Sequence, residues 1–156
     1  MDKPTSLLEV ADEVQEILFR IEVNLKGNKI VCETRENLKI DYDEILFELE
    51  RMPQIYHAWS QMYSEVKEQV NVADKKIRRR RGQLTAHIIS DMGKSMSRGT
   101  IADLVECDDS LLTLEADLFR LQKLAGKLYF TLESLKMKSE HMRSLCGFKR
   151  IEMQDS

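Results

Sequence analysis

The sequence predicts an all-α protein, an elongated hairpin or bundle of two long amphipathic helices with a shorter N-terminal helix. Only two prolines and six glycines interrupt the 156 residues, fewer than the turns of a sheet-rich fold require. Apolar residues recur at alternating four- and three-residue spacing in three separate stretches, the pattern of helices packed nearly parallel. A helix of about 35 residues spans roughly 50 Å, so such helices predict an elongated hairpin.

The shorter helix is expected over residues 6–26, within an N-terminal segment of residues 1–27. Ser6 and Glu9 have the spacing of a capping box at its start, and Gly27 is placed to end it. Its apolar seam is Leu7, Ala11, Val14, Leu18, Ile21 and Leu25. Residues 28–40 follow as a connector, where the apolar triplet of residues 30–32 favours a loop or extended segment over a strand.

The first long helix is expected to start at Asp41, which forms a second capping box with Glu44. Pro53 requires either a kink or a short helix that ends near Arg51, and the unbroken seam favours the kink. The seam consists of Ile45, Leu49, Met52, Tyr56, Trp59, Tyr63, Val66, Val70, Ala73 and Ile77. Its next position is Arg80, where the apolar pattern gives way to charge.

Residues 91–99 are the most turn-like segment, and residues 100–106 suit one or two helical turns. Asp108 or Asp109 is expected to cap the last long helix, which Gly147 would end before a frayed tail of residues 148–156. The hairpin core is therefore predicted over residues 41–147. Leu111, Phe119, Leu124, Phe130 and Leu145 lie off the main seam, so they either widen the intramolecular face or complete an oligomer.

The middle of the chain is basic and its flanks are acidic. Residues 61–100 carry nine Lys or Arg against four Asp or Glu, whereas residues 1–60 carry seven against thirteen. Six cations occupy the seven positions from Lys75 to Arg81, and on a helix they point all round the axis. Their mutual repulsion favours a bound polyanion such as nucleic acid, although a solvated face paired with the acidic first helix is the alternative. The predicted contacts, within a basic end of residues 75–98, are Lys75, Lys76, Arg78, Arg79, Arg80, Arg81, Lys94 and Arg98.

Other chemistry has little support in the sequence. The three cysteines and three histidines lack metal-ligand spacing, so neither a metal nor a cofactor is predicted. Gly93-Lys94-Ser95 lacks the earlier glycine and strand of a phosphate-binding loop, and no catalytic constellation is visible, so an enzyme is not expected. No run of about 18 apolar residues exists, and the N-terminus does not have the order of a signal peptide, which predicts a cytoplasmic protein without membrane contact.

The central stretch resembles the UvsY-type recombination mediator proteins of tailed phages. Family members have an Ile-Asp pair, an aliphatic residue, a Glu, an aliphatic-Tyr pair and then Trp or Tyr. Here these residue types follow without a gap as Ile40-Asp41, Ile45, Glu48, Ile55-Tyr56 and Trp59. The segment Met52-Pro53-Gln54-Ile55-Tyr56-His57 is also similar to an Ile-Pro-Gln-Leu-His stretch of some members. The resemblance covers roughly residues 38–148.

The resemblance implies a non-enzymatic accessory protein. Such mediators form hexameric or heptameric rings, bind single-stranded DNA without sequence specificity, and help load a RecA-like recombinase onto strands covered by single-strand-binding protein. Their DNA contacts lie in a Lys-x-Arg stretch followed by a Tyr-Tyr pair and a Gly. The counterparts here are Arg78, Arg79, Arg80 and Arg81, with Ala86-His87-Ile88 near the position of the missing Tyr-Tyr pair.

Two other functions stay open from the sequence. A coiled-coil structural or regulatory protein–protein interaction module would use the arginines to bind an acidic protein. A phage packaging or tail-assembly helper is the third hypothesis. A ring-sized homo-oligomer with salt-sensitive oligonucleotide binding would favour the mediator, which would act in the cytoplasm of the host cell.

Overall fold

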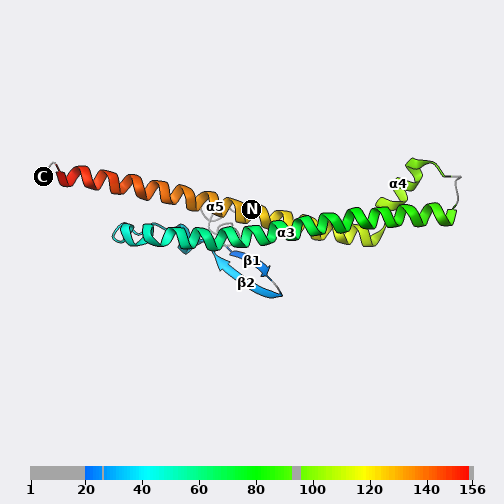
Figure 1. Cartoon of the computed structure of the whole chain (residues 1–156), viewed down its shortest axis with the longest axis horizontal. Helices are drawn as coiled ribbons and strands as arrows, with labels where there is room; N and C mark the ends of the chain where they lie inside the picture. The colour runs from blue at the N-terminus through cyan, green and yellow to red at the C-terminus, as the bar shows by residue number, and fades with distance from the viewer. Residues whose placement is uncertain (1–19, 26, 93–95, 155–156) are drawn as a thin grey trace, which may run out of the picture. The chain divides into compact units, whose positions relative to one another are not determined.

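The structure is a computed structural model that describes residues 20–25, 27–92 and 96–154. Its elements, in order, are β1 (Arg20–Leu25), β2 (Asn28–Glu33), α2 (Arg35–Leu38), α3 (Ile45–Met92), α4 (Arg98–Glu106) and α5 (Asp109–Gln154) (Figure 1). The predicted all-α class and its two long helices are confirmed, with one small antiparallel sheet in addition. No described helix combines the length and apolar character that a bilayer span needs.

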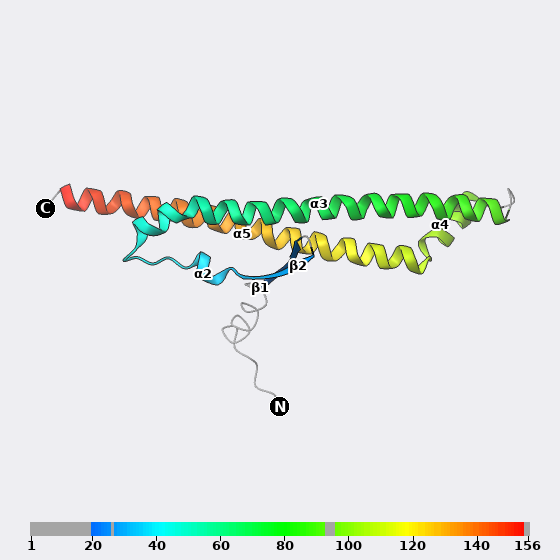
Figure 2. The same cartoon turned by 60° about the horizontal axis from the view of Figure 1, so that its bottom comes forward.

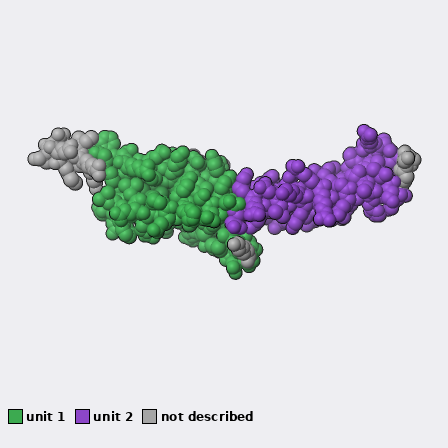
Figure 3. All heavy atoms as spheres, in the orientation of Figure 1, with its two compact units in different colours: residues 1–64, 126–156 green, residues 65–125 purple. Residues whose placement is uncertain are grey.

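The chain divides into two units, to each of which α3 and α5 contribute a segment. Unit 1 comprises residues 1–64 and 126–156, and unit 2 comprises residues 65–125 (Figure 3). Unit 2 carries the basic block, so its packing determines which cations reach solvent.

In unit 1, the predicted seams form the buried sides of the two helices. Met52 and Trp59 of α3 and Leu128, Leu135 and Met142 of α5 are each at most 4% exposed. The sheet and α2 lie on one side of these helices (Figure 2). Their attachment has a polar component, because the Lys138 Nζ of α5 donates to the backbone carbonyls of Asn37, at 3.0 Å, and Lys39.

The N-terminal region differs from the prediction. Residues 20–25, expected to end a helix over residues 6–26, instead form β1, and residues 1–19 lie outside the described part of the chain. Ile21 and Val23 are 1% exposed and alternate with exposed residues, the period of a strand with one buried face. Gly27 does not end a helix; at φ +83° it lies in the turn between β1 and β2. The predicted connector of residues 28–40 contains β2 and α2.

The limits of both long helices also differ from those predicted. The helix α3 begins at Ile45, because Asp41 accepts a hydrogen bond from the amide of Asp43 at 3.0 Å and so supports a turn before the helix. It continues through Pro53, so the alternative of two helices was wrong. Gly147 does not end α5, which runs to Gln154 through most of the predicted tail. One glycine lowers the stability of a helix by only about 1 kcal/mol relative to alanine, which is not enough to end a long helix.

Unit 2 has its own core, built by α3, α4 and the start of α5. Ile77, Leu84, Val105 and Leu111 are buried, and Ile88, Leu114 and Leu118 pack against them. The seam of α3 was predicted to end at Ile77. It continues beyond that residue, because Leu84 and Ile88 also belong to this core. Ser97 caps α4 by accepting from the Thr100 amide at 3.2 Å, which confirms a short helix in this region.

The residues off the main seam of α5 differ in how far they are buried. Leu111 is fully buried in the core of unit 2, whereas Phe119 and Phe130 are 67% and 70% exposed. The expectation that this set widens the intramolecular face therefore fails for both phenylalanines. Both rings therefore present apolar surface of α5 to solvent.

Candidate nucleic-acid interface

The basic block lies on α3, and its position relative to the buried seam separates its six cations into two groups. Each residue advances an α-helix by about 100°, so Ile77 and Leu84 share the buried side. Measured from Ile77, the side chains of Arg80 and Arg81 lie about 60° and 40° away on opposite sides. The other four lie between about 100° and 160° away, on the outer side of the helix. This outer group is Lys75, Lys76, Arg78 and Arg79, and all four are exposed.

The outer group keeps most of its charge available to solvent. Only Arg78 has a carboxylate partner, Asp74 one turn earlier, at 2.8 Å, and the Arg78 side chain is still 77% exposed. Exposed pairs of this kind contribute about 0.3–0.5 kcal/mol, too little to compete with a multivalent ligand. Within residues 20–25, 27–92 and 96–154, no carboxylate lies within ion-pair distance of Lys75, Lys76 or Arg79.

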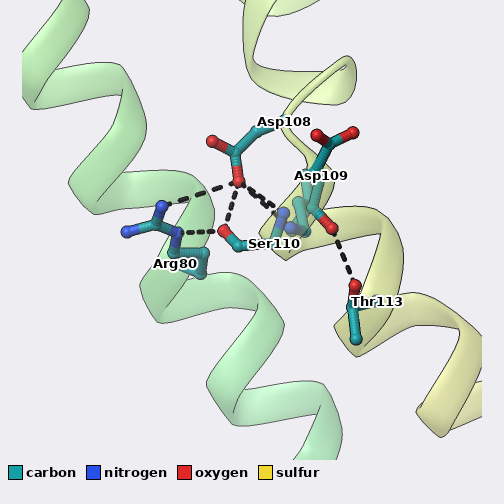
Figure 4. Close-up of polar contacts among 6 residues, drawn as sticks. Arg80, Asp108, Asp109, Ser110 and Thr113 are labelled. Carbon is teal, nitrogen blue, oxygen red and sulfur yellow. Dashed lines mark hydrogen bonds and ion pairs between the residues drawn. The ribbon is translucent and has the colours of Figure 1, made fainter.

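Arg80 is bound to the start of α5. Its Nε donates to the Ser110 hydroxyl at 2.7 Å, and its Nη2 lies 3.5 Å from an Asp108 carboxylate oxygen (Figure 4). The same oxygen accepts from the backbone amides of Ser110 and Leu111, each at 3.1 Å, and so caps α5. Arg80 is thereby part of a helix cap.

The contacts of Asp108 in this cap stabilise the ionised form of its carboxyl group. The Ser110 hydroxyl that donates to it is the main reason why the pKa of its carboxyl lies below the ordinary value. The Leu111 amide and the charge of Arg80 lower this pKa further, and desolvation partly opposes them. A carboxylate with this many donors stabilises the cap and keeps Arg80 next to it.

Arg81 lies between two helices. Its Nη2 donates to Glu115 of α5 at 2.6 Å and to Glu106 at the end of α4 at 3.2 Å. The Arg81 side chain is 44% exposed, so solvent still reaches it. Arg80 and Arg81 together join α3 to α4 and α5. The sequence predicted both arginines as DNA contacts and did not predict this structural role.

Of the two candidates beyond the block, only Arg98 lies in the described part of the chain. Arg98 is exposed and begins α4, about 12 Å along that helix from Glu106, the residue that meets Arg81. Lys94 lies outside the described residues. The structure therefore places four of the predicted residues on the outer face of α3. It pairs the other two cations of the block, Arg80 and Arg81, with carboxylates of the chain itself.

The acidic partners were missed from the sequence. Asp108 was predicted as a possible helix cap but not as a partner of Arg80, and Glu106 and Glu115 were not predicted as partners of Arg81. Contacts 25 to 34 residues apart in the chain carry no local pattern. The sequence did contain one indication. If Ile77 and Leu84 are both taken as seam positions, the step of about 100° per residue places Arg80 and Arg81 at the edges of the seam.

Aromatic residues do not contribute to the block. Trp59, predicted to be a core residue, is 4% exposed. Tyr63 and Tyr129 contact each other in unit 1, with ring centroids 6.1 Å apart. Tyr56 is 40% exposed, so its place on the predicted seam did not bury it. The basic face of unit 2 is an electrostatic surface built from cations.

Comparison with known proteins gives one consistent result. No family model and no curated protein matches the sequence. Three crystal forms of the recombination mediator protein UvsY of bacteriophage T4 match the structure, with TM-scores of 0.63, 0.65 and 0.64. They are 12–14% identical to this chain, and the alignments cover 95%, 76% and 96% of it and 99%, 95% and 98% of the UvsY chains. The chain shares the fold of UvsY. Because both chains are covered almost fully in two of the three forms, the shared fold includes both long helices.

Proposed function

We propose that this chain is a non-enzymatic recombination mediator that binds single-stranded DNA without sequence specificity. It helps to load a RecA-like recombinase onto strands covered by single-strand-binding protein, in the cytoplasm of a host cell. The observation that carries the proposal is the outer group on α3, Lys75, Lys76, Arg78 and Arg79, on a fold shared with a phage recombination mediator.

The outer group suits phosphates more than any protein surface of this chain. Four exposed cations within five residues repel one another, and a run of phosphates neutralises them while releasing counterions from the strand. Contacts to phosphate carry no sequence information, which is why binding without sequence preference follows. Because contacts to phosphate dominate such binding, it is expected to depend strongly on salt.

A salt titration with an oligodeoxythymidylate tests this proposal. If four phosphates are met by each protomer, the log-log slope of affinity against salt is about −3 for a single strand. The fourfold variant K75Q/K76Q/R78Q/R79Q should lose most of the affinity and most of the slope. Its matched control replaces four exposed cations elsewhere, K67Q/R120Q/K123Q/K136Q, where Arg120 has a helical carboxylate partner as Arg78 does. Equal losses in both variants, or no loss in the first, would refute the assignment.

Self-association is part of the same proposal. Phe130, Met137 and Phe148 of α5 are 66–70% exposed and lie seven and eleven residues apart, which returns each to the same side of the helix within about 20°. Large exposed apolar residues on one side of a helix support packing against another helix. In a hexameric or heptameric ring, several outer groups would bind one strand, so weak single sites would give tight binding through multivalency.

A further inference from the structure

Arg81 is the one member of the basic block that is shared between two carboxylates. Glu106 belongs to α4 and Glu115 to α5, and both lie within 3.2 Å of its guanidinium. The three side chains are 34–54% exposed, so the cluster is open to solvent and to ions. This differs from Arg80, whose partner Asp108 is fixed by the backbone of the helix that it caps.

The fit between Arg81 and its partners is incomplete. The buried Nε lies 3.2 Å from the Glu106 carboxylate, but the two are not aligned for a hydrogen bond. A buried donor without an aligned acceptor raises the free energy of the folded state. A guanidinium offers parallel donors that match two oxygens of one phosphate or carboxylate group, so an incoming phosphate could satisfy the Nε better than Glu106 does.

The position of Arg81 on α3 brings it next to the outer group. Arg78 precedes it by three residues, and side chains three apart are neighbours on a helix surface. Arg78 is 77% exposed, so a strand bound there would carry its next phosphates past Arg81. A strand held at the outer group therefore raises the local concentration of phosphate at the Arg81 cluster.

We propose that Glu106 and Glu115 are internal competitors that occupy Arg81 in the free protein and give it up to a phosphate of a strand held at Arg78. The proposal rests on polyanion binding by the outer group, and it adds a regulated fifth contact to that site. A single small anion does not carry the neighbouring charges that hold it at Arg78, so the exchange selects for polyanions. The carboxylates thus lower the affinity for short or isolated anions more than for a continuous strand.

The test compares two variants with equal changes of charge. E106Q/E115Q removes both competitors. D103N/D109N removes one carboxylate from each of the same two helices, and neither forms an ion pair with an arginine among the described residues. Figure 4 shows the Asp109 carboxylate directed away from Arg80. Binding to an oligodeoxythymidylate is measured over a range of salt, after thermal denaturation has shown that each variant is folded.

The expected result is a gain that depends on Arg81. E106Q/E115Q should bind roughly tenfold more tightly than the wild type, a typical coupling between sites, and its salt slope should steepen by about 0.7. D103N/D109N should gain less than about threefold, because distant charges are screened, with an unchanged slope. R81Q should abolish the gain in the E106Q/E115Q background and change the wild type much less, in a double-mutant cycle.

Four outcomes would overturn the proposed competition between the carboxylates and phosphate, and the first three are separable from failure of the proposed function. A loss of affinity in E106Q/E115Q would show that the carboxylates only support the fold, and equal gains in both variants would show a general charge effect. A gain that persists in R81Q would assign it to another residue. The wild type could fail to bind the oligonucleotide but bind inorganic polyphosphate, with the same differences between the variants. That result would refute the proposed DNA function and still support competition by Glu106 and Glu115. Binding to neither polyanion overturns the proposed competition.

Discussion

Lys138 gives the sharpest test of what holds unit 1 together. It lies on α5 with its side chain only 6% exposed, which is rare for lysine without partners. Its Nζ donates to the carbonyls of Asn37 and Lys39, and Glu48 of α3 lies 3.0 Å away. One ammonium group therefore joins the C-terminal end of α2 to both long helices.

Replacing Lys138 by Met retains the apolar stem of the side chain and removes all three contacts. Loss of one partner of a buried ion pair costs about 3–5 kcal/mol, because the remaining charge is left uncompensated. Glu48 is 23% exposed and can still reach water, so the lower end of the range is expected. A loss of about 3 kcal/mol lowers the melting temperature of a chain of this size by roughly 10 °C.

Thermal denaturation of K138M at fixed protein concentration measures this loss. K136M is the matched control, since Lys136 is an exposed neighbour on the same helix. E48M/K138M should recover part of the loss because it removes the stranded carboxylate. Hydrogen exchange should also become faster at the amides of residues 38 and 39, which bond to Thr34 and Arg35 in α2. A K138M variant no less stable than K136M would refute the role of this contact.

Three further predictions follow from single features. G27A should cost about 1 kcal/mol because its φ of +83° strains a Cβ, and G27N should cost less in the same denaturation assay. The lowered pKa of Asp108 stabilises the fold above about pH 4 and this stability is lost as the pH falls below that value, so acid titration should separate the wild type from D108N, which retains a good capping residue but lacks the transition. F130S/M137S should reduce the sedimenting mass of the protein, whereas I89S, which changes an exposed residue of α3, should not.

The long helices were predictable because their periodicity is extended. Met52, Trp59 and Val66 repeat over several turns and are all buried, as are Leu128 and Leu135. Burial of such a stripe stabilises a helix more than the propensity of any one residue, which is why Pro53 did not end α3. The length and period of the apolar pattern therefore predicted the existence of the helices, whereas the positions of the helix ends depended on local contacts.

The sheet was missed because a short segment fits two periods at once. Ile21 and Leu25 continue a four-three pattern from residues 7–18, but Ile21, Val23 and Leu25 also alternate with polar residues. Gly27 with Asn28 suits the end of a helix and equally a tight hairpin turn. Only pairing with β2, from Arg20 opposite Glu33 to Leu25 opposite Asn28, distinguishes the two.

The sequence predicted where the basic block lies, but not which of its cations face outward and which pair with carboxylates of the chain. Charge alone identified the block, because a run of six cations is visible in any conformation. Which of them face outward depends on the seam, and the seam was taken to end at Ile77 although Leu84 continues it. The partners Glu106 and Glu115 come from helices after a turn, so no local spacing indicated them.

The outer group should destabilise the free protein, and this cost is measurable without any ligand. Lys75 with Arg78, Lys75 with Arg79 and Lys76 with Arg79 are like charges three or four residues apart, and together these pairs cost about 1 kcal/mol.

Gln forms helices about as well as Lys or Arg, so K75Q/K76Q/R78Q/R79Q should be more stable than the wild type at low salt by about that amount, while binding polyanions less well. The difference should shrink as salt screens the repulsion and reverse when an oligonucleotide stabilises only the wild type. Cations placed to stabilise this fold would give the opposite sign at low salt, since their removal would lower the melting temperature. A face that weakens its own helix until a polyanion binds is the physical property expected of a binding surface and not of a structural one.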